Sequence, residues 1–540
     1  MAVEQLITQH IDTWTSALRP RSTAGRGASG KIDLYGIKKL RELILELAVR
    51  GKLVPQDPND EPASELLKQI AKERDELVKS KVIRKPKTLE KITNSKIPFE
   101  LPDGWEWCYL NDIGNWGAGS TPSRSNSEYY NGNIPWFKSG ELSSDFISDS
   151  EETVTELALQ ECSLRDNNIG DVLIAMYGAT IGKTSILNVR GTTNQAVCAC
   201  TPYSGISNVY LLTLLKAYKR IFIGMGAGGA QPNISREKLI ATVFALPPKA
   251  EQNRIICKVH ELMSLCDQLE QQSLTSLEAH SQLVETLLST LTDSQNAEEL
   301  AENWARISQH FDTLFTTEAS VDALKQTILQ LAVMGLLIES PEFNQKNNLK
   351  KYLSFGPKNG LSPSEVKYQT DVKVLKLGAT SYGYLKLQET KYVDIDVSND
   401  SHLFLKKNDI LIQRGNSSNF VGCSLLIEED FDDLIYPDLM MKIRTNDELL
   451  PEYTALWLSS PFARKYMWSK MTGTSGTMPK ISKKVVEEVP IAVPALVVQR
   501  QLVIKIKQLF LLCRSLKSRL QSAQQTQLHL ADALTDEALN

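Results

Sequence analysis

The segment of this chain closest to a catalytic motif is GATIGKTS at residues 178–185. A phosphate-binding P-loop reads G-x-x-x-x-G-K-[ST], whereas one residue fewer lies between Gly178 and Gly182. The second half of the chain holds a related segment, in which DVLIAMYGATIGKTSIL is matched by DILIQRGNSSNFVGCSLLI and Lys183 is replaced by Cys423. A nucleotide site would keep its lysine in both copies. An enzyme that hydrolyses nucleotides through Lys183 is therefore the weaker alternative.

Other residues with catalytic or metal-binding chemistry show no recognisable spacing. The sequence has no GxSxG, no HExxH and no GxGxxG between a strand and a helix, and it lacks the Asn/Asp-Pro-Pro-aromatic tetrapeptide of amino-methyltransferases. Among eight cysteines, only Cys198 and Cys200 form a C-x-C, which is more often part of a buried strand than a metal site. We predict no catalytic residue, no metal site and no cofactor-binding residue in this chain.

Bulk properties place the chain in a broad class. A length of 540 residues predicts roughly three or four domains. The net charge of −4 means that any nucleic-acid site is a local patch. Unpaired cysteines favour a reducing compartment, and no apolar run is long enough to span a membrane, so we expect a cytoplasmic protein.

The chain contains one unit twice. Residues 226–269 align without a gap to residues 473–516, and each copy runs from a Gly-rich loop through a short element and a proline into a long helix. The helix expected at 36–53 also has a counterpart at 321–337. A repeat of this length indicates two copies of one folded unit. Identical pairs include Gly226/Gly473, Gly229/Gly476, Pro232/Pro479, Ile234/Ile481, Ser235/Ser482, Pro247/Pro494, Gln252/Gln499 and Cys266/Cys513.

Two long helices are expected, one from 250 to about 291 and one at the C-terminus. Their apolar residues step by three and four, which is heptad spacing and needs a partner helix. We expect the two helices to pack on each other as an antiparallel coiled coil. The predicted apolar seam is Ile255, Val259, Leu262, Cys266 and Leu269, weakening at Ser273 and resuming at Leu283, Leu287 and Leu291, and in the second helix Leu502, Ile506, Leu509, Cys513, Leu516 and Leu520.

The remaining segments predict a head in each half. Residues 4–18 have the pattern of one amphipathic helix, with Leu6, Ile7, Ile11, Trp14 and Leu18 on its apolar side, and residues 56–97 that of a long charged helical insert. Each head mixes short strands, turns and a helix, which in the second head is expected over 451–465. The predicted fold class is α+β, with two similar mixed α/β heads separated by the two long helices and related by a pseudo-twofold. The expected domains are 1–30 (N-terminal helix and flexible basic linker), 31–96 (helical region), 97–248 (first head), 249–340 (central long helix, connector and repeat helix), 341–494 (second head) and 495–540 (C-terminal long helix).

Both heads carry polar, Gly-rich loops at matching places. Glycine lets the backbone approach a surface, and polar or cationic side chains can reach base edges or phosphates. Each residue alone is more often an ordinary turn residue, but two loop sets on one scaffold, with a spacer between them, favour recognition of two short sequences. The candidate DNA-binding residues are Ser120, Thr121, Arg124, Lys138, Ser139, Tyr177, Thr180, Lys183, Gln231 and Asn233 in the first head, and Tyr382, Lys386, Arg414, Asn416, Ser417, Thr474, Ser475 and Lys480 in the second.

On these residues the chain resembles the specificity subunits of Type I restriction-modification enzymes. The resemblance rests on the duplicated G-x-x-G-x-x-P-x-I-S segment before each long helix, on GSTPS at 119–123, IPW at 134–136, GDVLIAMYGATIGKT at 170–184 and NQAV at 194–197. It covers nearly the whole chain. The second copy departs from the pattern, because it lacks the TPS loop and has Ala495 where the first copy has Pro248.

The resemblance implies a division of labour. Each head would be a target recognition domain that reads one half of a bipartite, asymmetric site in double-stranded DNA, and the helices would set the spacing and dock two methyltransferase (modification) subunits. S-adenosylmethionine, ATP and Mg²⁺ would be bound by those partners and by motor-nuclease (restriction) subunits. Two alternatives stay open: a coiled-coil scaffold whose heads bind proteins, and the specificity subunit of a related fused nuclease-methyltransferase system.

Overall fold

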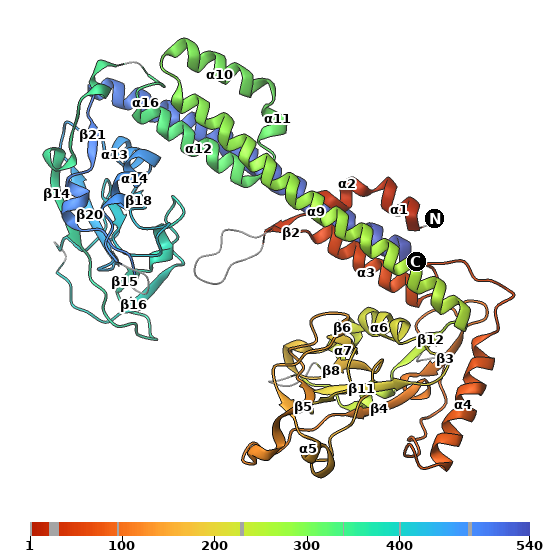
Figure 1. Ribbon diagram of the computed structural model, residues 1–540. Coiled ribbons are helices and arrows are strands. Elements are labelled where there is room, and N and C mark those ends of the chain that lie inside the picture. The colour runs from red at the N-terminus through yellow and green to blue at the C-terminus, as the bar shows by residue number, and fades with distance from the viewer. Residues whose placement is uncertain are drawn as a thin grey trace. The chain divides into compact units, whose positions relative to one another are not determined.

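A computed structural model describes residues 3–20, 32–93, 97–226, 232–338, 340–398, 401–473 and 478–539 (Figure 1). The chain forms two compact units. The first comprises Met1–Arg19, Asp33–Ser273 and Thr526–Asn540, and the second comprises Pro20–Ile32 and Leu274–Gln525. None of the helices within these described ranges is both long and apolar enough to cross a membrane.

The N-terminus forms two helices rather than the single helix predicted over 4–18. α1 (Val3–Gln9) and α2 (Ile11–Ser16) meet at His10, and Ile11 is 39% exposed although it was expected on the apolar side. α2 packs closely on α3 (Tyr35–Val49), where Trp14 is fully buried and the Gly36 amide donates to the Ala17 carbonyl at 2.9 Å. The N-terminal helices therefore dock on this chain. The predicted linker at 21–31 lies outside the described residues.

The charged insert is only partly helical. α4 (Ala63–Lys79) packs its apolar face on the first head through Leu66 and Ile70, and the chain from Ser80 to Thr93 contains no helix or strand. The prediction of a helix through 56–97 was therefore wrong for the described residues outside α4. The backbone turns at Lys81, whose φ of 60° lies in the left-handed region and ends the helix.

The first head is built on a five-stranded sheet in the order β4-β11-β8-β9-β6. Its residues alternate between two cores, so that Val172 and Ile174 belong to a different apolar cluster from Leu173 and Ala175. α6 packs on β8 and β9. The elements are β3 (Glu106–Tyr109), β4 (Gly114–Ala118), β5 (Tyr130–Phe137), β6 (Phe146–Ile147), β7 (Thr153–Val154), α5 (Glu156–Glu161), β8 (Val172–Ala175), β9 (Thr184–Leu187), β10 (Thr192–Thr193), β11 (Val197–Pro202), α6 (Asn208–Ala217), α7 (Lys219–Gly226), α8 (Arg236–Ile240) and β12 (Val243–Leu246).

The second head repeats this plan on a four-stranded sheet in the order β14-β20-β17-β18. The helix predicted over 451–465 is two helices, because Ser460 caps a new helix that begins at Pro461. The elements are β13 (Lys346–Asn348), β14 (Leu353–Asn359), β15 (Val372–Leu375), β16 (Thr390–Val393), β17 (Ile410–Gln413), β18 (Ser424–Leu426), β19 (Leu434–Ile435), β20 (Met440–Thr445), α13 (Pro451–Leu458), α14 (Pro461–Ser469), α15 (Lys483–Glu487) and β21 (Pro490–Ala492). The chain also has β1 (Arg19–Pro20) and β2 (Ile32–Asp33).

The long helices are α9 (Lys249–Asp293) and α16 (Leu496–Leu539), as the heptad pattern predicts. The first unit holds the beginning of α9 and the end of α16, and the second unit holds the end of α9 and the beginning of α16, the order of an antiparallel pair. The seam from Ile255 to Leu269 is buried as predicted. After Ser273 the buried positions are Val284, Leu288 and Leu291, whereas the predicted Leu283 is 50% exposed.

A third helix joins the long helices in each unit. In the first unit, Arg41 of α3 pairs with Asp267 and Glu270 of α9, while Lys39 pairs with Asp532 of α16. In the second unit, α12 (Glu318–Val333) takes the place of α3, and α10 (Ala297–Gln309) and α11 (Phe311–Leu314) precede it. The fold class of two repeated mixed α/β heads with long helices is confirmed, and its helical part includes α3 and α12.

Candidate nucleic-acid interface

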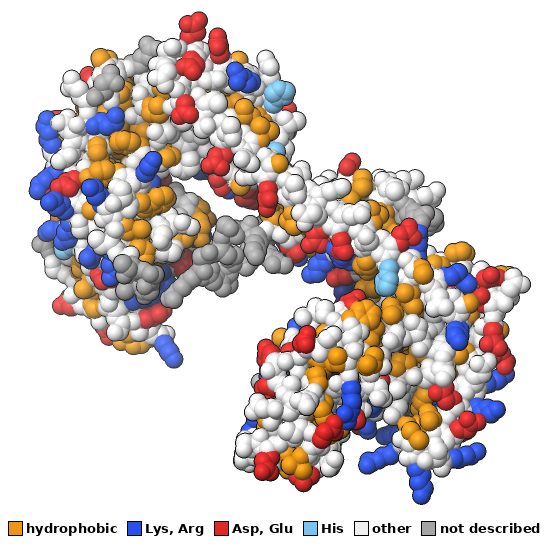
Figure 2. All heavy atoms as spheres, in the orientation of Figure 1, with side chains coloured by type: hydrophobic (Ala, Val, Ile, Leu, Met, Phe, Trp, Pro, Cys, Tyr) orange, Lys and Arg blue, Asp and Glu red, His pale blue; other side chains and the backbone are white. Residues whose placement is uncertain are grey.

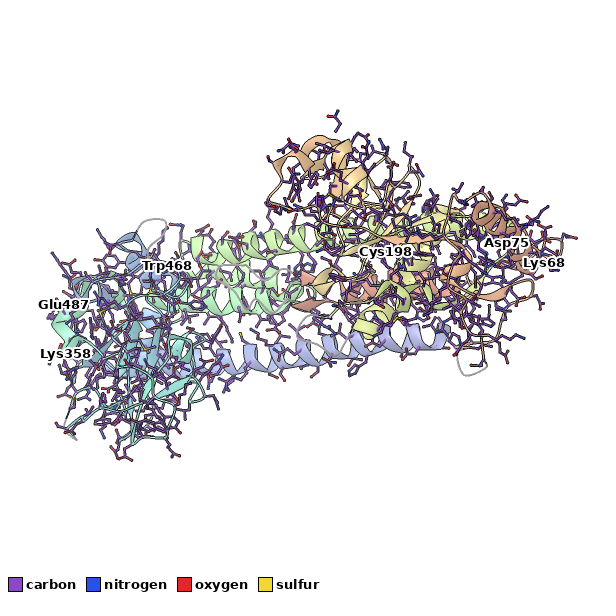
Figure 3. All side chains as sticks on the ribbon, turned by 90° about the horizontal axis from the view of Figure 1, so that it is seen from below. Lys68, Asp75, Cys198, Lys358, Trp468 and Glu487 are labelled. Atoms are coloured by element: carbon purple, nitrogen blue, oxygen red, sulfur yellow. The ribbon has the colours of Figure 1, made fainter. Side chains whose placement is uncertain are left out.

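Strand register places the polar loops of the first head at one end of its sheet. Ala118 at the end of β4 lies opposite Cys198 near the start of β11, and Val197 lies opposite Ala175 at the end of β8. Ile174 in turn lies opposite Thr184 at the start of β9. The loops that follow β4 and β8 and precede β9 and β11 therefore leave the sheet at the same end, which we call the first loop edge. Cys198 itself is buried in the sheet (Figure 3), as the sequence predicts for a strand residue.

The GSTPS loop at the first loop edge is held by hydrogen bonds to residues of β10 and β5. The Ser120 amide donates to the Thr193 carbonyl at 3.0 Å, and the Trp136 indole donates to the Ser120 carbonyl at 3.1 Å. The Thr121 hydroxyl donates to the Gln195 side chain. A Cβ on Gly119 would lie 2.0 Å from the Thr193 carbonyl oxygen, so only glycine fits this approach. The loop is thus a fixed part of the edge.

A second contact at this edge joins the segment after β8 to the segment after the Gly-rich loop. Tyr177 forms a β-bridge with Asn233, and the amide of Gly178 donates to the carbonyl of Pro232 at 2.7 Å. Tyr177 is 40% exposed, and its carbonyl accepts the Thr180 hydroxyl at 2.7 Å. The neighbouring candidate Gln231 lies outside the described residues. Backbone bonds therefore fix this part of the edge and leave the Tyr177 and Asn233 side chains available.

The candidate cations of the first head are already engaged within the protein. Arg124 and Lys138 both bind Glu152, each with a nitrogen–oxygen distance of 2.5 Å. Hydrogen bonds from Arg124 and then Lys138 lower the pKa of the Glu152 carboxyl to about 2. The Lys183 ammonium donates to the Gly140 carbonyl at 3.2 Å and so ties the loop after β8 to the half-buried loop of Ser139. Arg124 and Lys138 can reach a phosphate only by sharing or leaving Glu152.

The second head has a matching edge. Gln413 at the end of β17 lies opposite Met440 at the start of β20, and Ile412 lies opposite Ser424 at the start of β18. Gly415 forms a β-bridge with Lys480. In the repeat, Gly415 aligns with Tyr177 and Lys480 aligns with Asn233 of the first head. The two heads thus build the same backbone bridge from residues with different side chains. We call this end of the second sheet the second loop edge.

Gln413 organises the second loop edge, although it is not among the residues predicted from the sequence. It is 1% exposed, and its side-chain nitrogen donates to the Leu377 carbonyl and to the hydroxyls of Thr380 and Ser381 at 2.9–3.0 Å. Its side-chain oxygen accepts the Asn416 amide at 2.6 Å. The signal was present in the repeat, because Gln413 aligns with the apolar Ala175 of the first head.

Aromatic and cationic side chains gather on the segment that Gln413 holds. The Lys386 ammonium lies 4.1 Å from the centre of the Tyr382 ring, and that ring meets Phe420 at 5.8 Å edge to face. Tyr382 is 60% exposed. Such a ring can stack on a base while the ammonium approaches a phosphate. Arg414 is half-buried, Ser417 and Lys480 are exposed, and Thr474 and Ser475 lie outside the described residues.

A buried ion pair underlies the second head and has no counterpart among the described residues of the first. Asp409 and Lys442 are both fully buried and 2.9 Å apart, and Arg444 also donates to Asp409. Burial lowers the pKa of Lys442. In the first head the aligned Asp171 instead accepts the Thr201 hydroxyl at 3.0 Å. The heads therefore share an aspartate position but stabilise it differently.

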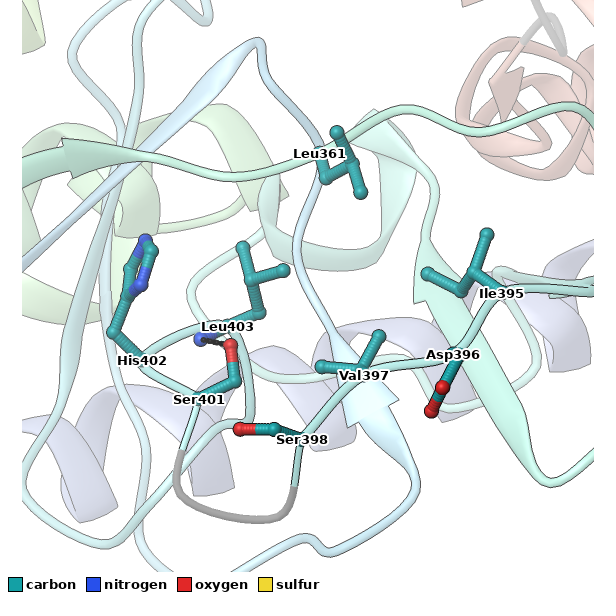
Figure 4. A pocket seen from close by; sticks show the side chains of 8 residues that line it. All are labelled: Leu361, Ile395, Asp396, Val397, Ser398, Ser401, His402 and Leu403. Carbon is teal, nitrogen blue, oxygen red and sulfur yellow. Dashed lines mark hydrogen bonds between the residues drawn. The ribbon is translucent and has the colours of Figure 1, made fainter.

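No feature of the described chain has the geometry of a metal centre. The described residues contain no group of His, Cys, Asp and Glu side chains that could hold a metal ion. An open hollow of about 740 Å³ in the second head is lined by Leu361, residues 395–398 and residues 401–403 (Figure 4). Its His402 ring lies 5.9 Å from Phe355, and burial lowers the pKa of that histidine. The polar contact drawn there is local, from the Leu403 amide to the Ser401 hydroxyl at 3.3 Å.

Comparison with known proteins identifies both halves. The family model of the Type I restriction modification DNA specificity domain matches residues 102–279 and again residues 355–524. The chain is 41% identical to the Type I restriction enzyme EcoEI specificity subunit and 40% identical to the EcoAI specificity subunit, both from Escherichia coli, with 100% of each chain covered. A chain in a solved structure of the type I R-M system matches 82% of this chain and 99% of its own length at 15% identity, with a TM-score of 0.48. On the two domain matches and the full-length relatives, the chain belongs to the family of Type I restriction-modification specificity subunits.

Proposed function

We propose that each head reads one half of a bipartite, asymmetric site in double-stranded DNA. The observation that carries this proposal is the pair of loop edges, which share one scaffold and differ in side chains. Tyr177 and Asn233 occupy the bridge of the first edge, and Gly415 and Lys480 occupy the same bridge in the second. One framework with two sets of exposed groups suits the recognition of two different sequences.

The side chains at the edges have distinct expected tasks. Asn233 suits the edge of an adenine, which asparagine can contact with paired hydrogen bonds. Lys183, Lys386 and Lys480 suit phosphates, which position the protein without reading sequence. Tyr382 suits stacking on an exposed base or sugar face. The first edge would therefore discriminate mainly through amide and hydroxyl groups, and the second through a mixture of amide, cationic and aromatic groups.

The chain would supply recognition and leave the chemistry to its partners. Specificity subunits of this family act with other restriction-modification subunits, and we propose that two methyltransferase subunits dock along α9 and α16 and that motor-nuclease subunits join them. S-adenosylmethionine would then be bound by the methyltransferase subunits, and ATP and Mg²⁺ by the motor-nuclease subunits. The working compartment of such a complex would be the cytoplasm, where its DNA is found.

The proposal is tested by Asn233→Ala. Backbone bonds hold the bridge at this position, so the fold is expected to persist, while discrimination at one base pair of one half-site falls by about 1–3 kcal/mol. The matched control is Asn188→Ala, an exposed asparagine just beyond the other end of β9. Binding of the full chain with its modification subunit would be measured on DNA carrying single mismatches in either half. Discrimination unchanged in both halves, or lowered equally in both, would contradict the assignment.

A further inference from the structure

A basic segment of the first unit lies apart from the first loop edge. Residues 79–91, which we call the basic arm, carry six cations against the single acid Glu90. All six cations are exposed, and within the described part of the chain none of them has an ion-pair partner; they are Lys79, Lys81, Arg84, Lys85, Lys87 and Lys91. Blue side chains gather below α4 in Figure 2. In a chain of net charge −4, this concentration needs a specific explanation.

The backbone of the basic arm is attached to the first head. The Tyr109 hydroxyl donates to the Glu90 carbonyl at 3.0 Å, and the Asn111 side chain donates to the Lys87 carbonyl at 3.3 Å. α4 is itself fixed by buried Leu66 and by an ion pair of Arg74 with Asp112 at 3.7 Å. The cations are therefore presented from a held backbone, which lowers the entropy lost when they bind a ligand.

The end of helix α4 explains only part of the positive charge of the basic arm. Val82 donates to the Leu77 carbonyl and Lys81 to the Val78 carbonyl, the pattern in which a glycine usually occupies the left-handed position. Here Lys81 occupies it, at φ 60°. Cations near the end of a helix interact favourably with its dipole, but that effect is confined to the last turn. Arg84, Lys85 and the cations after them lie beyond that turn.

The basic arm lies at the opposite end of β4 from the first loop edge. Asn111 precedes Gly114, which pairs with Pro202, whereas the loops leave the sheet near Ala118. The arm therefore adds charge away from the groups expected to read bases. Its lysines are strongly hydrated point charges that suit phosphates without demanding a fixed geometry.

We propose that the basic arm binds the phosphates of duplex DNA outside the recognised half-site, independently of sequence. This inference rests on the proposed function in requiring a DNA-bound protein, but it makes no use of the loop edges. The second copy of the repeat has no equivalent segment, so the contact would be made beside the first head alone. An acidic protein surface is the competing ligand, and the experiment below separates the two.

The test compares Lys85→Gln/Lys87→Gln with the control Lys68→Gln/Lys72→Gln, which makes the same charge change on exposed residues of α4 (Lys68 and Asp75 mark this helix in Figure 3). Affinity of the full chain for a duplex of random sequence would be measured against salt concentration. Each lost phosphate contact lowers the slope of log K on log salt by about 0.9, so the arm variant should lose between about 1 and 2 in slope, and the control should not change. A third variant, Lys81→Gly, should bind random DNA more weakly while unfolding at the same or a higher temperature, because glycine relieves the left-handed backbone.

Two results would overturn the inference. One is an unchanged salt slope in the arm variant. If assembly with the modification subunit is weakened in that variant instead, the ligand of the basic arm is an acidic protein surface. The other is an equal loss of slope in the control. Failure of the proposed function would look different, because the wild-type complex would then show no preference for any DNA sequence, whatever the arm variants do.

Discussion

Replacing Gln499 with alanine is expected to destabilise the unit that contains the second head. Gln499 is fully buried at the start of α16, and its side chain makes three hydrogen bonds. Its oxygen accepts the amide of Leu450, the residue that precedes α13, at 2.9 Å, and its nitrogen donates to the carbonyls of Glu448 and Pro494 at 2.9 and 2.8 Å. Gln252 makes the equivalent bonds in the first unit, with the Ser207 amide and the carbonyls of Gly205 and Pro247. This glutamine therefore ties each head to its long helix.

The magnitude follows from these bonds. Each hydrogen bond contributes about 1 kcal/mol net, and a buried group left without a partner costs about 1–3 kcal/mol. Gln499→Ala removes three bonds and strands one amide and two carbonyls, although water admitted to the site would satisfy part of them. We expect a loss of about 3–5 kcal/mol in the free energy of unfolding, which corresponds to a fall in Tm of roughly 10 °C for a unit of this size.

Calorimetry of the full chain measures this directly. Gln501→Ala is the matched control, because Gln501 lies on the same helix and is exposed, and it should change stability by no more than about 0.5 kcal/mol. Gln252→Ala should lower the unfolding temperature of the first unit instead. If Gln499→Ala behaves like Gln501→Ala, the glutamine that follows a proline at the same spacing in both copies does not anchor the heads.

Three further predictions concern other contacts. Glu152→Gln should strengthen binding to random DNA, because two cations lose their acidic partner. Since the pKa of Glu152 is lowered, its contribution to stability should be full above about pH 4.5 and be lost as the pH falls toward 2. The acid unfolding curves of wild type and variant should therefore converge only in that pH range. Gly36→Ala would place a Cβ 2.3 Å from the Trp14 carbonyl oxygen, so the N-terminal helices should undock and become sensitive to limited proteolysis, whereas Ile11→Ala should leave them protected. Asp409→Asn leaves the buried Lys442 without its counter-ion and should cost about 3–5 kcal/mol, measured by denaturant unfolding; a cost below about 1 kcal/mol would show that the pair contributes little.

Much of the helical framework could be predicted from the sequence, because heptad spacing and internal repetition are local signals. The weakening of the pattern at Ser273 even coincides with the boundary between the two compact units. The register after that point could not be predicted, since Leu283 and Val284 are both apolar and only packing into the apolar core of the second unit, to which Val284 belongs, selects Val284. The extent of the insert was overestimated because charged residues favour helix, whereas Lys81 ends α4 through its backbone conformation.

The candidate site, like the helical framework, could be predicted only in part from the sequence. Strand order brings the polar loops of each head together, and the repeat indicated which segments to compare. Ionic partners were not predictable, because Glu152 lies 28 residues from Arg124 in sequence and is brought to it only by the fold. Gln413 was missed because its role depends on hydroxyls and a carbonyl from a distant loop.

The central claim is that this chain reads two separate half-sites and leaves methylation to its partners. Mapping of methylated bases across the genome, in cells with and without this chain and with the Asn233→Ala variant, tests it most directly. We expect a bipartite, asymmetric motif with a fixed gap that disappears without the chain, and a variant that relaxes the motif in one half only. A single uninterrupted motif, or a methylation pattern that does not depend on this chain, would rule out the reading of two half-sites by this chain.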